Sequence, residues 1–213
     1  MDCDTRLPLF PLRTVLFPGG RLPLQIFEVR YLDMIGWAHR EGLPFGVVCL
    51  TEGDEVRRSV DGSFVSEVFH PFGTLARIDW LDRPRPGLIT LRCTGLQRFR
   101  LESFECLPHG LWVGHAQPLP DDPQVPIPCD LEHTRLALQR VVGDLHRQGI
   151  GEEDMPIQGP WRFDDCGWVA NRWCDLLPLS NTLRQQLLVV DSPLVRLELV
   201  ADALERFREP DGR

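Results

Sequence analysis

The sequence contains no lysine. All 23 basic residues in this chain of 213 residues are arginine. A P-loop of the form G-x-x-x-x-G-K-[ST], a Ser-Lys catalytic dyad and a Schiff-base lysine each require a lysine side chain. The sequence therefore excludes, within this chain, three large groups of enzymes that depend on one of these features.

Patterns that bind metals or cross membranes are also absent. There is no C-x-x-C pair and no H-E-x-x-H segment, and Cys129 with His133 would supply only two ligands, so we expect no metal and no cofactor. The seven cysteines form an odd number and the first residues lack a signal segment, which favours a reduced, cytoplasmic protein. Every uncharged apolar run is shorter than the roughly 18 residues that span a bilayer, so we expect no contact with a membrane.

The charge balance is acidic. With 31 Asp and Glu against 23 Arg, the net charge is −8, which opposes the phosphates of nucleic acids. We therefore expect no general nucleic-acid binding, although Arg83 and Arg85 with Trp80 form a local patch that keeps RNA as an alternative partner. The acidic runs 152–154 and 164–165 lack the pattern of a calcium loop, and we interpret them as solvated loops.

The chain changes character near residue 119. Residues 119–128 contain four prolines in ten positions, which predicts an extended linker. Residues 1–118 hold 13 Arg against 14 acidic residues, while residues 119–213 hold 10 Arg against 17 acidic residues. We predict a β subdomain over 1–118 and a helical subdomain over 129–213.

The first part has the pattern of short strands around one helix. The apolar spacing predicts a helix that begins at Val29 and stops at Gly42, and a polar loop is expected over 52–63. The predicted strands cover residues 7–12, 21–27, 44–50, 65–69, 73–81, 87–94, 97–106 and 111–118. Several short strands with one inserted helix favour a closed or nearly closed antiparallel barrel.

The second part has helical periodicity. It predicts helices over 131–149, 166–177, 182–190 and 193–208, with Ser180 or Asn181 and then Ser192 as N-caps. We interpret these helices as a small bundle and the spacing of Trp161, Trp168 and Trp173 as packing rather than ligand stacking. The fold class is therefore α+β.

Signatures of catalysis are missing. The chain has no G-x-S-x-G segment, and its six histidines are scattered without a metal-binding spacing. No pattern places two carboxylates in one cleft, and we expect no enzymatic activity.

Several runs of residues resemble one family. Three of these runs lie near the start of the chain: L-P-L-F-P-L (7–12), V-L-F-P-G-G (15–20) and L-P-L-Q-I-F-E-V-R-Y (22–31). Two lie in the middle, G-T-L-A-R-I (73–78) and T-G-L-Q-R-F (94–99), and two near the end, Q-Q-L-L (185–188) and D-S-P-L-V-R-L (191–197). Together, and in this order, they resemble the Lon N-terminal domain family, including its stand-alone members.

The resemblance implies a fold and a role. It implies a PUA-like pseudo-barrel followed by a helical bundle, and a region that helps to recognise unfolded or tagged proteins. In Lon proteases an ATPase module and a Ser-Lys protease domain follow, but a chain without lysine contains neither. We interpret most residues of the 22–31 run as structural, with Glu28 and Arg30 ordering the start of the helix. The candidates for polypeptide contact are Phe17, Phe27, Glu28, Arg30 and Tyr31.

Three hypotheses about function follow. The first is a non-catalytic polypeptide-binding module, an adaptor for unfolded or damaged proteins, that uses an apolar groove between barrel and bundle and exposed strand edges. Its partners would be unfolded or partly folded polypeptides, with a protease or chaperone as a further partner. The alternatives are an RNA-binding PUA-like module and a small-molecule-binding protein that uses the cleft between the two subdomains. The sequence predicts neither the ligand nor the oligomeric state.

Overall fold

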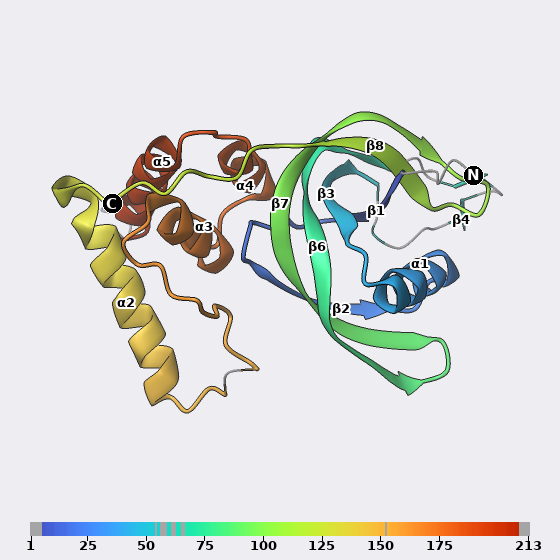
Figure 1. The fold of residues 1–213 in the computed structure, drawn as a ribbon, viewed down its shortest axis with the longest axis horizontal. Coiled ribbons are helices and arrows are strands. Elements are labelled where there is room, and N and C mark those ends of the chain that lie inside the picture. Colours follow the sequence, from blue (N-terminus) through green and yellow to red (C-terminus); the bar gives the residue numbers. More distant parts are fainter. Residues whose placement is uncertain are drawn as a thin grey trace. The chain divides into compact units, whose positions relative to one another are not determined.

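The computed structural model describes residues 6–53, 55, 59–60, 63–64, 67–151 and 153–208. The chain forms two compact units, Met1–Asp121 and Asp122–Arg213, which we call the strand unit and the helical unit (Figure 1). The boundary between them falls inside the proline-rich segment 119–128. The prediction of a mixed α+β fold is confirmed.

The described residues of the strand unit form eight strands and one helix. These are β1 (Leu7–Leu12), β2 (Arg21–Ile26), α1 (Val29–Glu41), β3 (Phe45–Glu52), β4 (Ser59–Val60), β5 (Ser63–Phe64), β6 (Val68–Arg85), β7 (Leu88–Cys106) and β8 (Trp112–Pro118). Six strands form one sheet in the order β2-β7-β6-β3-β1-β8, while β4 pairs with β5 at the end of the predicted polar loop 52–63.

The large sheet closes on itself. Strand β8 pairs with β1 on one side and with β7 on the other, so β7, β6, β3, β1 and β8 form a ring, and β2 adds to β7 outside it. The expected fully antiparallel arrangement is wrong at one place, because β1 and β3 are parallel. The reason is the crossover: β2 and α1 lie between these two strands in the chain and return it to the same end of the sheet.

Two strands are longer than the sequence predicts. Strand β6 joins the predicted strand 73–81 to residues 68–69 of the predicted strand 65–69, whose residues 65–66 lie outside the described part. Strand β7 joins residues 88–94 of one predicted strand to the next predicted strand, 97–106. The sequence predicts a strand start at Gly73 and a turn at Gly95, but both glycines lie inside strands where another backbone passes closely. An added Cβ would stand 2.3 Å from the Val47 oxygen at Gly73 and 2.2 Å from the Phe17 oxygen at Gly95.

Helix α1 begins and ends near its predicted limits. Gly42 adopts the left-handed conformation, with φ of 65°, and terminates the helix. The helix contributes Tyr31, Met34 and Ile35 to the main core of the strand unit, where they join Phe10 and other buried residues of the sheet. Burial alternates along β7: Ile89, Leu91 and Cys93 are buried in the same core, and the residues between them are half-buried.

The helical unit follows the predicted periodicity. A short 3-10 turn, η1 (Cys129–Leu131), leads into α2 (Glu132–Arg147), which is followed by α3 (Cys166–Leu176), α4 (Asn181–Leu188) and α5 (Pro193–Arg208). Ser180 accepts a hydrogen bond from the Leu183 amide and Ser192 accepts one from the Val195 amide, each at 3.3 Å, so both predicted N-caps are confirmed.

The core of the helical unit includes a buried arginine. Helix α3 packs against α5 and α2. Arg196 of α5 is completely buried and donates to Asn171 of α3 at 3.1 Å and to the Leu187 carbonyl at 3.2 Å. It also forms a two-contact ion pair with Asp122, one contact of which measures 3.1 Å. Arg196 therefore joins α5 to α3, to the end of α4 and to the start of the unit.

Two absences apply to the described residues only. None of their helices combines the length and apolar character needed to cross a membrane. Within the same ranges, no three His, Cys, Asp or Glu side chains come together in a way that could hold a metal ion.

Candidate functional site

The five predicted contact residues divide into buried and exposed ones. Phe17, Tyr31 and Arg30 are 1%, 2% and 6% exposed, whereas Phe27 is 55% exposed. Glu28 lies at the N-cap of α1 and is half-buried. Only Phe27 and Glu28 can therefore reach a ligand without a change in the surrounding packing.

The buried residues form a charged network. The Arg30 guanidinium donates to the two Glu67 oxygens, at 2.8 and 3.3 Å, to the Gly110 carbonyl at 2.8 Å and to Glu28 at 3.1 Å. It also lies over the Tyr31 ring, 4.4 Å from the centroid. Burial alone would lower the pKa of Arg30, but the hydrogen bond and charge of Glu67 offset this and the pKa is raised. Glu28 makes no side-chain capping hydrogen bond, so it orders the helix start through Arg30.

Glu67 connects this network to the surface. Its carboxylate also accepts the indole N–H of Trp112. Trp112 belongs to an aromatic cluster with Phe69 and Phe104, whose ring centroids lie 4.9 to 5.9 Å apart. Phe69 is buried, while Phe104 is 48% exposed. The network thus holds a partly exposed apolar surface on the strand unit, which we call the aromatic surface (Phe69, Phe104 and Trp112).

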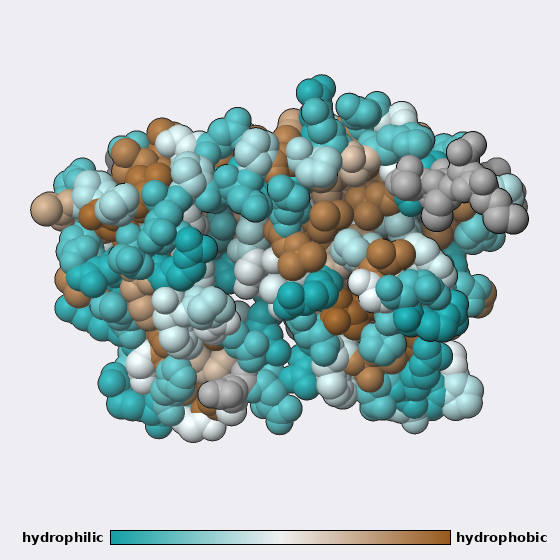
Figure 2. All heavy atoms as spheres, viewed as in Figure 1, coloured by the Kyte–Doolittle hydropathy of each residue, from teal (hydrophilic) through white to brown (hydrophobic). Residues whose placement is uncertain are grey.

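The sheet geometry explains why these side chains meet. Phe69 lies at the start of β6, Phe104 lies near the end of β7 and Trp112 begins β8. Phe104 pairs with Gly114, and an added Cβ at Gly114 would stand 3.2 Å from the Phe104 Cβ and 2.7 Å from the Ser103 oxygen. Glycine at this position leaves room for the register shift that brings Phe104 beside Trp112. Figure 2 shows further hydrophobic areas over the strand unit in its view.

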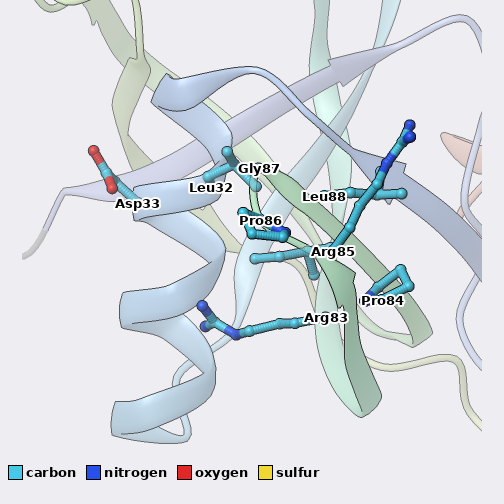
Figure 3. Close-up of a pocket in the computed structure, with 9 residues that line it drawn as sticks. Leu32, Asp33, Arg83, Pro84, Arg85, Pro86, Gly87 and Leu88 are labelled. Carbon is cyan, nitrogen blue, oxygen red and sulfur yellow. The ribbon is translucent and has the colours of Figure 1, made fainter.

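A second candidate site is a groove between α1 and the β6–β7 hairpin, which we call the hairpin groove (Figure 3). It has a volume of about 500 Å³ and is lined by Leu32 and Asp33 of α1 and by residues 83–89. Figure 3 shows Arg83 reaching across to α1 while Arg85 extends away from the helix and Asp33 points away from the hairpin. Neither arginine has a hydrogen bond or ion pair to any described residue, so the groove offers free guanidinium groups.

The predicted RNA patch is only partly assembled. Arg83 and Arg85 lie together at the hairpin groove, but Trp80 is stacked by Arg92, whose guanidinium lies 4.7 Å from the ring centroid. Trp80 lies on β6, as Arg83 and Arg85 do, and is 41% exposed. A nucleic-acid base could therefore stack on Trp80 only by displacing Arg92 or by using the part of the Trp80 ring that Arg92 leaves exposed.

The open strand edges carry prolines. Among the described strands, β2 pairs only with β7, and β6 has no partner besides β7 after Ala76. Pro23 lies in the middle of β2 and Pro84 near the end of β6, and neither can donate a main-chain hydrogen bond. Both edges are therefore poorly suited to adding a strand, and side-chain contact on the aromatic surface is the better-supported mode of binding.

The buried thiols are weak nucleophiles. Burial raises the pKa of Cys166 to about 11 and that of Cys174 to about 12, with smaller contributions from neighbouring carboxylates. Burial also raises the pKa of Cys93. These three cysteines are buried, stay protonated near neutral pH and serve as small core residues.

The residues of the aromatic surface are not among the contact residues that the sequence predicts. Phe69, and Glu67 which holds Trp112, lie in the short predicted strand 65–69 that follows a predicted polar loop. The proximity of Phe104 and Trp112 could have been predicted from the sequence. The predicted strands 97–106 and 111–118 flank a short connection, and antiparallel pairing across it places Cys106 opposite Trp112 and Phe104 nearby.

Solved structures show the same fold. A Lon N-terminal domain protein from Xanthomonas campestris is 31% identical, with a TM-score of 0.71 over 93% of this chain and 98% of that chain. The N-terminal domain of a Mycobacterium avium complex Lon protease shares the fold at 15% identity, with a TM-score of 0.57 over 93% and 97% of the two chains. The strand unit followed by the helical unit is thus the architecture of Lon N-terminal domains.

The family is established by the sequence as well. The model of the ATP-dependent protease La (LON) substrate-binding domain matches residues 6–206, and the chain belongs to this family. A Lon protease from Flavobacterium johnsoniae is 30% identical over 102 residues, which is 47% of this chain and 12% of that protein. The chain therefore matches only a small part of the length of this curated relative.

Proposed function

We propose that this chain is a non-catalytic polypeptide-recognition module that serves as an adaptor for unfolded or damaged proteins. The substrate-binding domain family supports a role in substrate recognition. The observation that carries the proposal is the aromatic surface, where Phe104 is 48% exposed although it packs against Phe69 and Trp112. In this proposal the strand unit corresponds to the PUA-like barrel of the family and the helical unit to its bundle.

The chemistry of the aromatic surface fits an unfolded chain. Folded proteins bury most of their large apolar side chains, whereas an unfolded polypeptide presents them. Phe104 offers apolar contact area, and Trp112 is held in place by the hydrogen bond from its indole N–H to Glu67. A preorganised aromatic side chain loses little conformational entropy on binding, which favours recognition without a fixed sequence.

The proposal is tested by comparing one protein in two states. A labelled, permanently unfolded polypeptide is titrated with the full chain, and the same polypeptide in its folded form is titrated in parallel. We expect binding to the unfolded form only. Phe104→Ser should weaken that binding about tenfold, as expected for the loss of one aromatic anchor.

The matched control is Phe207→Ser. Phe207 of α5 has a similar exposure, 51%, but belongs to the helical unit and not to the aromatic surface. This variant should bind as the unchanged chain does. Equal binding to folded and unfolded polypeptide, or equal losses for the two variants, would contradict the proposal.

The hairpin groove supports an anionic ligand as a second candidate function. Arg83 and Arg85 line the groove without an acidic partner among the described residues. A mobility-shift titration with structured RNA at low salt tests this alternative, and an Arg83→Glu, Arg85→Glu double variant should abolish any shift that depends on the groove. The absence of a shift with the unchanged chain would remove RNA from consideration.

A further inference from the structure

The hairpin groove carries positive charge that no described residue neutralises. Arg83 and Arg85 are exposed, and neither makes a hydrogen bond or ion pair with a described residue. Asp33 is the one acidic residue among the described residues that line the groove, and Figure 3 shows it pointing away from the hairpin. An anionic group that enters the groove would therefore meet a guanidinium group without displacing a carboxylate.

Helix α1 leaves room for Arg83. An added Cβ at Gly36 would stand 3.6 Å from the Arg83 Nη2 atom, so the guanidinium lies beside the helix at this residue. Figure 3 shows Arg83 reaching toward α1, whereas Arg85 extends away from the helix. Because the two side chains diverge, Arg83 is the residue placed for direct contact, and Arg85 contributes attraction over a longer distance.

Much of the groove wall is apolar. Leu32 and Leu88 are half-buried, so part of each residue is accessible, and Pro84 and Pro86 are exposed. Both prolines lack a main-chain N–H, so this wall is poorly suited to hydrogen-bond a chain that runs past it. The groove thus offers contact to an apolar side chain close to a positive charge.

A single carboxylate suits this combination better than a polyanion does. The net charge of −8 repels a nucleic acid, and the Trp80 ring on which a base would stack already lies 4.7 Å from the Arg92 guanidinium. A guanidinium binds one carboxylate through two parallel hydrogen bonds. The ligand that matches the groove therefore has one carboxylate with an apolar side chain next to it.

We infer that the hairpin groove binds the C-terminal residue of a polypeptide when that residue is apolar. The terminal carboxylate would accept hydrogen bonds from Arg83, and the side chain would contact Leu32 and Leu88. At a C-terminus both groups are attached to one Cα, so a groove of about 500 Å³ accommodates them and no chain has to leave on the far side. The inference rests on the proposed function, because it takes the ligand to be a polypeptide, and it adds a contact that does not involve the aromatic surface.

The first test compares four short peptides with the full chain. One is acetyl-Gly-Ser-Gly-Ser-Leu with a free carboxylate, the second has a C-terminal amide instead, and the third ends in glycine instead of leucine. The fourth, acetyl-Gly-Leu-Glu-Ser-Gly amide, carries its carboxylate on an internal side chain. Broadening of the acetyl methyl signal in proton NMR spectra measures binding of each peptide.

The leucine peptide with a free carboxylate should bind best. We expect the leucine amide to bind about tenfold more weakly, because it loses the charge-assisted hydrogen bonds to Arg83. The glycine peptide should bind about fivefold more weakly, because it loses the apolar contact. The peptide with internal glutamate should bind no better than the leucine amide.

Three variants assign the effect to the groove. Arg83→Gln should weaken binding of the free-carboxylate peptide about tenfold and remove its advantage over the amide, while Arg85→Gln should weaken binding only about twofold. The control is Arg140→Gln. Arg140 of α2 is also exposed and has no hydrogen bond or ion pair with a described residue, so this variant should bind as the unchanged chain does.

The absence of lysine allows the site to be mapped directly. Arg83→Lys keeps the positive charge and introduces the only side-chain amine in the chain, whose acylation is measured by mass spectrometry. The free-carboxylate peptide at about four times its Kd should slow this reaction about fivefold, because only the unoccupied chain reacts. Arg140→Lys is the matched control, and it should react equally fast with and without the peptide.

The outcomes separate this inference from the proposed function. Equal binding of the free-carboxylate and amide peptides, equal binding of the internal-glutamate peptide, or protection of residue 83 by structured RNA but not by peptide would overturn the inference. Phe104→Ser should weaken binding of the unfolded polypeptide and leave the difference between the two leucine peptides unchanged. If Phe104→Ser has its expected effect and the two leucine peptides bind equally, the inference is wrong and the proposed function stands; the opposite pair of results reverses this conclusion.

Discussion

Arg30 and Glu67 form a buried ion pair in which one guanidinium meets both oxygens of one carboxylate, with N–O distances of 2.8 and 3.3 Å. The side chains are 4% and 2% exposed. Because Glu67 also accepts the indole N–H of Trp112, the pair links the start of α1 to the aromatic surface.

Removal of Glu67 should therefore be strongly destabilising. Glu67→Ala leaves the Arg30 charge buried without its main partner, and we expect the free energy of unfolding to fall by about 3 kcal/mol. Denaturant titration measures this change. Glu41→Ala is the control, because Glu41 pairs with Arg40 in an exposed contact and its loss should change the free energy by less than about 0.5 kcal/mol. Similar losses of unfolding free energy for both variants would show that the buried pair contributes no more to stability than the exposed one.

Asp122 should stabilise the helical unit far more than its neighbour Asp121. Asp122→Ala removes the carboxylate that pairs with the completely buried Arg196, and we expect a loss of about 3 kcal/mol. Asp121 is exposed, and Asp121→Ala should change the unfolding free energy by less than about 0.5 kcal/mol. Thermal unfolding monitored by helical circular dichroism distinguishes the two, and equal melting temperatures would contradict the prediction.

Two glycine substitutions should have opposite signs. Gly95→Ala forces a Cβ to within 2.2 Å of the Phe17 carbonyl oxygen, so the backbone must shift and stability should fall by about 2 kcal/mol or more. Gly143→Ala lies inside α2, where the new Cβ would come no closer than 3.8 Å to the end of the Arg147 side chain, and should stabilise the chain by about 0.5–1 kcal/mol. Paired denaturation curves test both, and a stabilised Gly95→Ala would refute the close approach.

Asp175 should make stability depend on pH. Burial raises the pKa of Asp175 from 3.8 to about 6, against the opposing effect of Arg172 and Arg184. The folded state therefore favours the protonated acid more than the unfolded state does. The contribution of Asp175 to the unfolding free energy is most favourable below the unfolded pKa and is lost as the pH rises toward 6.

The measurement compares the unchanged chain with Asp175→Asn at about pH 4 and about pH 7. The amide of the variant does not titrate. The unfolding free energy of the unchanged chain, taken relative to that of the variant, should therefore decrease from about pH 4 to about pH 7. A difference that stays constant or rises with pH would contradict the raised pKa.

The sequence predicted most helices and strands because their signals are local. Gly42 as a helix stop and Ser180 and Ser192 as N-caps act within one turn of the chain, and each was identified correctly. Gly73 and Gly95 were misjudged, because what they accommodate is a backbone segment far away in the sequence. A glycine that ends a strand and one that admits a neighbouring chain look the same in the sequence.

The candidate site also depends on contacts between residues that are far apart in the sequence. Arg30 and Tyr31 stood out in the sequence as part of a recognisable run, yet both are buried. Their partner Glu67 is 37 residues away from Arg30, and Trp112 lies further along the chain still, so no local pattern joins the three. Phe104 and Trp112 could have been associated through the hairpin that connects β7 to β8, but their exposure depends on the packing of the whole sheet.

The closed ring of strands also bears on how the protein is made. Strand β1 is synthesised first, yet it pairs with β3 and with β8, the last strand of the unit. One side of β1 must therefore remain without its partner until residues 112–118 have left the ribosome. Because domains generally fold as units during synthesis, the strand unit of a nascent chain stays open along this edge for most of its own translation.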